Sequence, residues 1–427
     1  MSFIDSIDLV KKSLDGLRLT RDEFKRIISD ALNGKLPDVA LSAFVVRQYL
    51  KPLSLEEVAD LTMAMVETGK TIEFGDMTVD KHSIGGVPGN KVSLLIVPII
   101  ASTGLKIPKT SSRSITTIGT ADTMEVLAPV EFKLDEVKEI VEKTNGCIVW
   151  GGALETAPAD DLFIRKVERV LRIDPVSQML ASIMAKKVAM GIKYLVLDIP
   201  EGKGTKAETL EAAYALSEMF IKLGKMLNIY VETAITYGDQ PVGHAVGPAL
   251  EAKEALMALE GHSPSASLIE KATGLAGILL EMTGKASPGK GQDMAKEILR
   301  SRKALEKMKE IIEAQGGDST ITSDKVPVGD KKADILAPVD GYVVAIDNRA
   351  VMAVVRAAGA PDVKGAGVFI YKKGGRYVKR GEPLMTIYAE KESNLDRAVE
   401  LARRLNPIII EGMIKERITP RDVGVVF

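Results

Sequence analysis

The sequence predicts an α/β protein that carries a separate all-helical lobe and a smaller C-terminal α+β subdomain. Residues 1–70 show apolar side chains at helical spacing. From 71 to 330, short apolar runs that end in glycine or hydroxyl-rich loops alternate with helical patterns. Beyond 333, glycine-rich hairpin patterns surround a helical segment. A chain of 427 residues, 46% of them hydrophobic, is long enough to form two or three domains.

Two capping boxes mark helix starts in the N-terminal lobe. Thr20 is followed three residues later by Glu23, and Ser54 is followed in the same way by Glu57. Residues 158–192 return to helical periodicity, and we expect them to complete this lobe. The α/β domain would then consist of residues 71–157 and 193–330.

A glycine-rich stretch follows the strand-like run from Met77 to Val79. It supplies glycines, hydroxyls and a lysine, namely Gly85, Gly86, Gly89, Ser83, Ser93 and Lys81. Glycine lets backbone N–H groups approach an anion closely, and Asn90 is expected to cap a helix whose positive end faces the loop. We therefore expect a phosphate site, with a plain turn as the alternative. The loop matches neither the P-loop nor the dinucleotide fingerprint.

A second polar loop follows the strand predicted at 107–110. It contains Ser111, Ser112 and Arg113, and a helix is expected to begin near Thr120. Two strand ends of this kind describe the mouth of an open α/β sheet, where ligands bind in such folds. The alternative is a solvent-exposed loop. Further buried strands are expected at 147–150, 194–199 and 229–235.

The polar stretch 315–332 is typical of a linker, and residues 333–427 would form the C-terminal subdomain. We expect structural and oligomer contacts there rather than catalysis. Its predicted helix extends from Glu390 to Leu405.

Composition argues against several classes of function. The net charge of −1 gives no general attraction to nucleic acid or anionic membranes. There is no apolar run of membrane-spanning length and no secretory signal, so a cytoplasmic protein is expected. Cys147 is the only cysteine, and His82, His244 and His262 are far apart in the sequence. No metal site is therefore expected.

Three motifs together resemble the signature of the thymidine phosphorylase and pyrimidine nucleoside phosphorylase family. They are Lys81-His82-Ser83-x-Gly85-Gly86, Ser111-x-Arg113 and Gly119-Thr120-x-Asp122-x-x-Glu125. The resemblance covers nearly the whole chain and is greatest to the branch that acts on AMP, known chiefly from archaea. It implies a fold like the class II nucleoside phosphorylases, a homodimer or larger homo-oligomer, and no cofactor beyond inorganic phosphate as co-substrate.

The reaction implied by this resemblance is AMP plus phosphate giving adenine and ribose 1,5-bisphosphate, with CMP and UMP as secondary substrates. The residues implied to hold the attacking phosphate are Lys81, Ser83, Gly86, Ser93, Ser111 and Thr120. Those implied to contact the nucleotide are Ser112, Arg113, Ser114, Ile115, Thr116, Thr117, Ser182 and Lys206. The catalytic residues implied are His82, Asp174 and Lys186. From the residues alone, the helix bearing Ser182 and Lys186 suits a surface stripe, and Lys206 suits a solvated loop.

Two of these residues carry specific expectations. Asp174 would donate a proton to the departing base, which requires a buried apolar setting; Leu171, Ile173 and Val176 could supply one. Arg113 and the hydroxyls after it would recognise the 5′-phosphate of a nucleotide through charge-assisted hydrogen bonds.

Three alternatives remain open. A pyrimidine nucleoside phosphorylase shares the fold, but Val167 stands where those enzymes place an arginine. A phosphoribosyltransferase resembling the anthranilate enzyme would need an acidic pair for magnesium pyrophosphate, and no convincing pair stands at a strand end. A catalytically silent nucleotide sensor is the third. There are two departures from the AMP-cleaving branch. The loop between Arg113 and Gly119 is one residue shorter, and the sequence begins almost directly at the helical lobe, where that branch usually carries an additional N-terminal domain.

Overall fold

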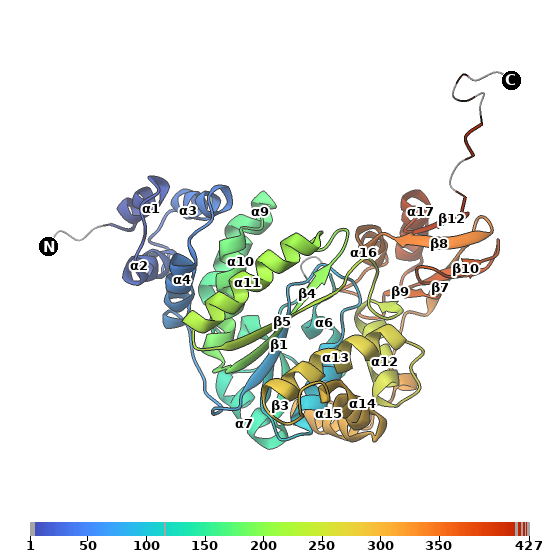
Figure 1. The fold of residues 1–427 in the computed structure, drawn as a ribbon, viewed down its shortest axis with the longest axis horizontal. Helices are drawn as coiled ribbons and strands as arrows, with labels where there is room; N and C mark the ends of the chain where they lie inside the picture. Colours follow the sequence, from blue (N-terminus) through green and yellow to red (C-terminus); the bar gives the residue numbers. More distant parts are fainter. Residues whose placement is uncertain (1–4, 115–116, 415–416, 420–421, 423, 425–427) are drawn as a thin grey trace.

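The computed structural model describes residues 5–114, 117–414, 417–419, 422 and 424. A helical lobe and a C-terminal domain flank a central α/β domain on opposite sides (Figure 1). The predicted fold class is thereby confirmed. None of the helices within these residues has the length and hydropathy required to cross a membrane.

The helical lobe packs around an aromatic centre. Its N-terminal helices are α1 (Ser6–Leu14), α2 (Arg21–Leu32), α3 (Asp38–Leu50) and α4 (Leu55–Glu67). Both predicted capping boxes form, one at Thr20 and one at Ser54. A second group completes the lobe: α8 (Pro158–Phe163), the π-helix η2 (Ile164–Glu168), α9 (Arg169–Leu171) and α10 (Val176–Ala189). The ring of Phe44 packs edge-on against Phe24 and Phe163, with centroids 6.2 Å apart in each pair.

Parallel strands form the centre of the α/β domain. They are β1 (Val79–Ser83), β2 (Ile107–Ser111), β3 (Gly146–Trp150), β4 (Tyr194–Glu201) and β5 (Tyr230–Tyr237). The order β1-β4-β5 continues on the other side of β1 to the pair β2-β3 through the bridge between Thr78 and Lys106. Because all of these pairs are parallel, the carboxyl ends of the strands meet at one edge.

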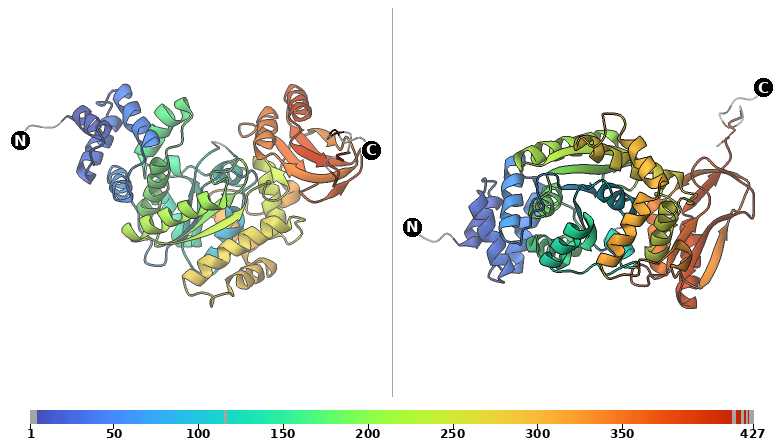
Figure 2. Two further views of the ribbon diagram at one scale, coloured as in Figure 1. Left: turned by 45° about the horizontal axis from the view of Figure 1, so that its top comes forward. Right: turned by 90° about the horizontal axis from the view of Figure 1, so that it is seen from below.

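Helices cover both faces of this sheet (Figure 2). Leu195, Leu197 and Ile199 of β4 belong to the core shared with the helical lobe and α11 (Leu210–Met226), whereas Val196 belongs to the core on the other face. That second core includes α5 (Ser93–Ala101) and α13 (Ala266–Met282). The other α-helices described in this domain are α6 (Thr120–Met124), α7 (Leu134–Thr144), α12 (Pro248–Leu259), α14 (Gly291–Arg300) and α15 (Lys303–Ala314).

The C-terminal domain contains two small antiparallel sheets and two helices. Its strands are β7 (Lys331–Leu336), β8 (Gly341–Ile346), β9 (Gly367–Ile370), β10 (Tyr377–Val378), β11 (Pro383–Ala389) and β12 (Ile408–Glu411). Its helices are α16 (Asn348–Ala357) and α17 (Glu392–Leu405). Strand β6 (Ala245–Val246) of the α/β domain pairs with β9, so the two domains share a sheet.

Candidate active site

The glycine loop lies where β1 ends, as predicted. Gly85, Gly86 and Gly89 all have positive φ angles, of 92°, 93° and 70°. A Cβ on Gly86 would lie 2.8 Å from the Cα of Thr205, so this position requires glycine for close packing as well as for conformation. The expected capping role of Asn90 is wrong, because α5 begins at Ser93 after an N-cap at Val92. The Asn90 amide instead donates to Ser83 Oγ at 3.0 Å and to Asp198 Oδ2 at 3.2 Å.

Asp198 is a buried anion that neighbours the loop. It lies 3.0 Å from Lys271 Nζ and 3.6 Å from Lys81 Nζ, and it accepts a hydrogen bond from Thr236 at 2.6 Å. Burial alone would raise the pKa of Asp198, but Lys271 and Lys81 together hold it well below its usual range. Burial lowers the pKa of Lys81 to about 8.

A second buried anion, Asp80, lies on β1, the strand that pairs with the β4 strand of Asp198. Its carboxylate accepts from Lys187 Nζ at 2.6 Å and lies 3.6 Å from Lys109 Nζ. Burial lowers the pKa of Lys109 to about 7, and desolvation together with the nearby lysines holds the pKa of His82 well below its usual value. His82 Nδ1 is buried without a hydrogen-bond partner among the described residues.

Lysines outnumber carboxylates in this cluster. Lys81, Lys109, Lys187 and Lys271 lie against Asp80 and Asp198. Because buried charge is costly unless it is compensated, the excess of positive charge favours an anionic ligand. Lys109 and Lys187 were missed as site residues, because a single lysine in a strand or helix pattern is typical of a solvated surface.

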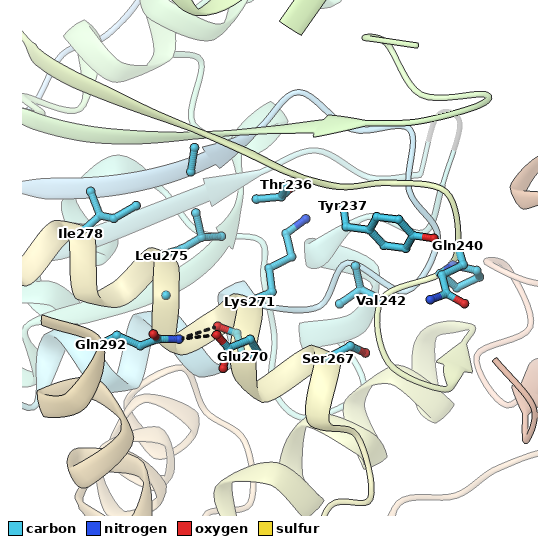
Figure 3. A pocket seen from close by; sticks show the side chains of 13 residues that line it. Thr236, Tyr237, Gln240, Val242, Ser267, Glu270, Lys271, Leu275, Ile278 and Gln292 are labelled. Carbon is cyan, nitrogen blue, oxygen red and sulfur yellow. Dashed lines mark hydrogen bonds between the residues drawn. The ribbon is translucent and has the colours of Figure 1, made fainter. Parts of the chain in front are cut away.

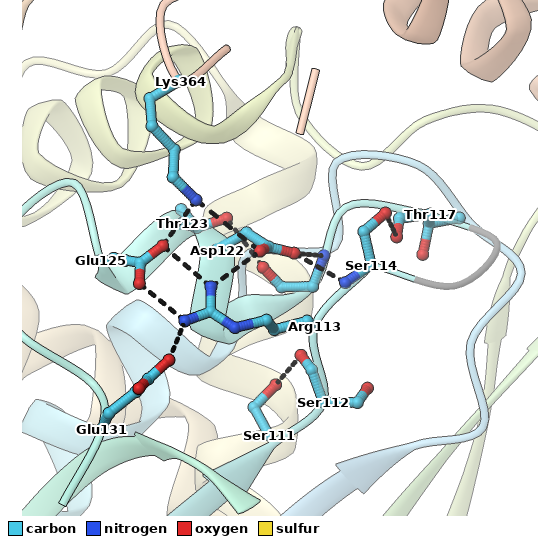
Figure 4. A network of polar contacts seen from close by, with 11 residues as sticks. Ser111, Ser112, Arg113, Ser114, Thr117, Asp122, Thr123, Glu125, Glu131 and Lys364 are labelled. Atoms are coloured by element: carbon cyan, nitrogen blue, oxygen red, sulfur yellow. Dashed lines mark hydrogen bonds and ion pairs between the residues drawn. The ribbon is translucent and has the colours of Figure 1, made fainter. Parts of the chain in front are cut away.

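The second polar loop is closed at its base by Asp122. Its Oδ2 accepts from the backbone N–H of Ser114 at 2.7 Å and of Gly119 at 3.2 Å. Ser114 Oγ donates to the carbonyl of Thr117 at 2.7 Å. Ser111 and Ser112 also belong to this loop (Figure 4). The predicted residues Ile115 and Thr116 lie outside the described residues.

Arg113, which we expect to recognise a 5′-phosphate, is paired with carboxylates. It makes two hydrogen bonds to Glu125, at 2.7 and 2.9 Å, and contacts Glu131 at 2.7 Å and Asp122 at 3.4 Å (Figure 4). Its guanidinium also lies 5.0 Å from the centroid of Trp150. Lys364 of the C-terminal domain lies 2.6 Å from the Glu125 carboxylate and joins the network. The charge of Arg113 is therefore already balanced by carboxylates.

The helical lobe contributes Ser182 and Lys186 from α10. Lys186 Nζ donates to Asp160 Oδ2 at 2.6 Å. Burial alone would lower the pKa of Lys186, but Asp160 raises it above its ordinary value.

The buried apolar setting expected for Asp174 is wrong. Its side chain is 56% exposed, and its carboxylate lies 2.8 Å from Lys206 Nζ. The apolar neighbours Leu171 and Val176 are themselves exposed.

Glu168 is a carboxyl group that sequence reasoning missed. It ends the π-helix η2, and helices of this type often occur at functional sites. Burial raises the pKa of Glu168 to about 8, and Asp160 and Asp174 contribute in the same direction. The group is therefore mostly protonated at neutral pH. No motif marked Glu168, because a single glutamate in a helical pattern is typical of a solvated helix face.

A cavity of about 450 Å³ lies between β5 and α13. Lys271 projects across it toward Thr236, and Tyr237, Gln240 and Gln292 lie along its rim (Figure 3). None of the predicted site residues that the structure describes lines it. Lys271, which lines the cavity, forms an ion pair with Asp198. Asp198 in turn accepts a hydrogen bond from Asn90 of the glycine loop, so the cavity and the loop share this carboxylate.

The described residues contain no group of three or more His, Cys, Asp or Glu side chains arranged to hold a metal ion.

Family models match three successive parts of the chain. Residues 7–69 match the helical bundle domain of a glycosyl transferase family, and residues 75–305 match the a/b domain of the same family. Residues 342–408 match the C-terminal domain of pyrimidine nucleoside phosphorylases.

Individual relatives give a finer comparison. The AMP phosphorylase of Thermococcus kodakarensis is 57% identical over 416 residues, which cover 97% of this chain and 82% of the relative. The AMP phosphorylase of Methanosarcina mazei is 56% identical over 415 residues, with the same coverage. In fold, the chain is similar to anthranilate phosphoribosyltransferase from Thermus thermophilus, with a TM-score of 0.61, 19% identity, and coverage of 74% of this chain and 100% of the other. The chain belongs to the AMP phosphorylases, enzymes of this glycosyl transferase family.

Proposed function

We propose that the protein catalyses the phosphorolysis of AMP to adenine and ribose 1,5-bisphosphate. Phosphate attacks the anomeric carbon as the bond from that carbon to the base nitrogen breaks, and the base leaves with a proton. The proposal rests on the similarity to AMP phosphorylases and, above all, on the excess of buried lysines beside the glycine loop. Because the nucleophile is a free anion, catalysis depends on positioning and electrostatic stabilisation rather than on a nucleophilic side chain.

The attacking phosphate would bind at the carboxyl ends of β1 and β2. We assign it to Lys81, Ser83, Gly86, Ser93, Ser111 and Thr120. The hydroxyls and backbone N–H groups of this set supply donors, and the buried lysines supply charge.

The second phosphate, the 5′ one, would bind at the loop that Asp122 closes. Ser112, Ser114 and Thr117 offer hydroxyls there, and Lys206 is the cation that we assign to it. Arg113 would hold the loop through Glu125 rather than carry the whole charge interaction. This assignment favours AMP over adenosine by about 10²-fold or more in kcat/KM.

The base would lie between the glycine loop and α10. Ser182, Lys186 and His82 are assigned to its surroundings. Asp174 is assigned to proton donation, and because its side chain is exposed here, it could hold a proton to donate only once the bound nucleotide covers it. Since Asp174 is paired with Lys206, binding of a 5′-phosphate by Lys206 would release the carboxyl group for that role.

A panel assay tests this function. Phosphate-dependent release of free base is measured for AMP, CMP, UMP, adenosine, uridine and thymidine, with and without magnesium. We expect AMP to give the highest kcat/KM, CMP and UMP to react more slowly, and magnesium to have no effect. Preference for uridine or thymidine would instead identify a pyrimidine nucleoside phosphorylase. A strict need for magnesium pyrophosphate would identify a phosphoribosyltransferase.

We also propose that the protein forms a homodimer through the helical lobe. Large apolar side chains are exposed there, including Leu14 of α1, Val39 and Leu50 of α3, and Val170 of α9. Val39 and Leu50 lie about three helical turns apart on α3 and so share one face of that helix, which favours an interface there. Substitution of Val39 and Leu50 by Glu should give monomers in light scattering, and a dimer that persists would place the interface elsewhere.

A further inference from the structure

Lys91 is a buried cation that none of the roles above uses. It ends the glycine loop, two residues before Ser93, and its side chain is fully buried. Its Nζ lies 3.1 Å from the carbonyl oxygen of Gly89, 3.1 Å from that of Val242 and 2.8 Å from that of Ala245. The Glu254 carboxylate lies 2.6 Å from the same atom.

These contacts join three segments of the α/β domain. Gly89 belongs to the glycine loop, Val242 and Ala245 belong to the segment after β5, and Glu254 belongs to α12. Glu254 also accepts the backbone N–H groups of His244 at 2.8 Å and Ala245 at 3.0 Å. One ion pair therefore fixes the glycine loop and the segment 242–245 against the same helix.

The loop and this segment are in close contact at Gly89. A Cβ there would lie 2.6 Å from the carbonyl oxygen of Val242 and 2.9 Å from that of Ala245. The carbonyls that converge at this point would repel each other if the ammonium were absent. The Glu254 charge would also lose its partner, and an unpaired buried charge is strongly unfavourable.

The opposite end of the loop is fixed separately. The backbone N–H of Ile84 donates to the carbonyl of Asp198 at 3.1 Å, and Gly86 packs against Thr205. Loss of the Lys91 contacts would therefore release the part of the loop nearest Ser93, while the part nearest Lys81 would keep its supports.

We propose that Lys91 is a positioning residue, whose ammonium group holds the glycine loop in the shape that binds the attacking phosphate. This inference rests on the proposed function, because it assigns the loop to phosphate. It predicts a selective effect: affinity for phosphate depends on Lys91 more than affinity for AMP does.

The test is Lys91→Ala with chemical rescue. The substitution removes three carbons and the ammonium group, which together correspond to n-propylammonium. We expect KM for phosphate to rise about 10-fold or more, because the charge-assisted contacts of Lys91 are lost. KM for AMP should change less than about threefold. Millimolar n-propylammonium should restore phosphate affinity in part, whereas tetramethylammonium at the same concentration should not, because it cannot donate hydrogen bonds.

Lys373 provides a matched control. From the C-terminal domain it donates to the carbonyls of Pro241 and Gly243, the latter at 2.8 Å, so it holds the same segment but not the glycine loop. Lys373→Met should leave KM for phosphate within about twofold and show no response to the amine.

If Lys91→Ala does not fold, a second variant tests the same proposal. Glu254→Gln keeps the volume and one oxygen acceptor but removes the negative charge, and it should raise KM for phosphate in the same selective way. Unchanged phosphate KM in the folded variants, or equal changes for phosphate and AMP without amine rescue, would overturn the role of Lys91. If wild-type protein released no adenine, the proposed function would fail instead. Calorimetric binding of inorganic phosphate to wild type and variant would then decide the role of Lys91 separately.

Discussion

Lys206 Nζ lies 2.8 Å from Asp174 Oδ2 and thereby joins the loop after β4 to the helical lobe. The pair links the residue that we assign to the 5′-phosphate with the residue that we assign to proton transfer. Since the Lys206 and Asp174 side chains are 29% and 56% exposed, the pair contributes little to stability and can separate when a ligand binds.

Lys206→Met should selectively impair the reaction of the nucleotide compared with that of the nucleoside. Met keeps the length of the side chain but removes the charge, so kcat/KM for AMP should fall by about 10²-fold. Activity on adenosine, which lacks the phosphate, should change less than about twofold. Lys203→Met is the control, because Lys203 is exposed in the same loop. Equal losses on AMP and adenosine would remove Lys206 from recognition of the phosphate.

Asp174→Asn should separate proton transfer from binding. The amide has the same shape and still accepts from Lys206, but it cannot act as an acid. We expect kcat to fall by about 10²-fold or more while KM for AMP is largely unchanged. Single-turnover measurement of adenine release gives the rate of the chemical step directly. Wild-type turnover would exclude Asp174 from the mechanism.

The raised pKa of Glu168 predicts that activity falls at alkaline pH. The pKa of this carboxyl is raised to about 8 by burial and by Asp160 and Asp174, so it is neutral below that pH and anionic above it. Glu168 interacts electrostatically with Lys186, which we assign to the surroundings of the base, so an anion there would oppose the charge that the base develops. Wild-type kcat should therefore fall as the pH rises through about 8.

Glu168→Gln tests this limit, because glutamine stays neutral at every pH. The variant should keep its activity near neutral pH and lose the decline near pH 8. An alkaline decline of the same position and size in the variant would show that another group titrates there. Asp161→Asn is a suitable control, because partial desolvation also raises the pKa of that carboxyl, although the residue is exposed.

The sequence predicted the fold class because its signals are local. Glycines at positive φ, such as Gly85, and capping pairs, such as Thr20 with Glu23, depend on neighbours within a few residues. The charged groups of the site depend on distant ones. Lys109 is buried because β2 lies beside Asp80 of β1, and Asp174 is exposed because its apolar neighbours do not fold over it. No spacing rule describes such environments.

Arg113→Met should destabilise the protein, because Glu125 would lose a two-bond partner. A hydrogen bond to a charged group contributes about 1.5–3 kcal/mol. Because the Arg113–Glu125 pair is partly exposed, we expect the free energy of unfolding to fall by about 2 kcal/mol, on the order of one such bond. Glu131→Gln, at an exposed carboxylate, should cost less than about 1 kcal/mol. Urea titration at neutral pH measures both. Equal stability of wild type and Arg113→Met would show that the network of Figure 4 is dispensable.

The same pair has a pH signature. The hydrogen bond from Arg113 lowers the pKa of Glu125 from 4.5 to about 2. A carboxylate with a lowered pKa contributes stability that is complete above its unfolded pKa and is lost as the pH falls through the folded value. Wild type should therefore lose stability between pH 4.5 and about 2 more steeply than Arg113→Met.

Lys109→Met should weaken phosphate binding in a way that depends on pH. Burial lowers the pKa of Lys109 to about 7, so the lysine is largely charged at about pH 6 and largely neutral at about pH 9. The ammonium of Lys109 lies in the cluster with Lys81 and Lys187 around Asp80 and Asp198, and each positive charge there attracts phosphate. At about pH 6 the variant should show a KM for phosphate about 10-fold above that of wild type, as expected for one nearby charge.

At about pH 9 the ratio of the variant's KM for phosphate to that of wild type should approach one, because wild-type Lys109 has then lost its proton. Phosphate itself titrates in this range, but it does so identically for both proteins, so the ratio isolates the lysine. Lys138→Met, on the exposed side of α7, should give a ratio of one throughout. Since Met also removes the hydrogen bond from Lys109 to the carbonyl of Thr110, a purely structural role would raise KM equally at both pH values. A ratio that does not change with pH would therefore show that Lys109 shapes the site without supplying charge to it.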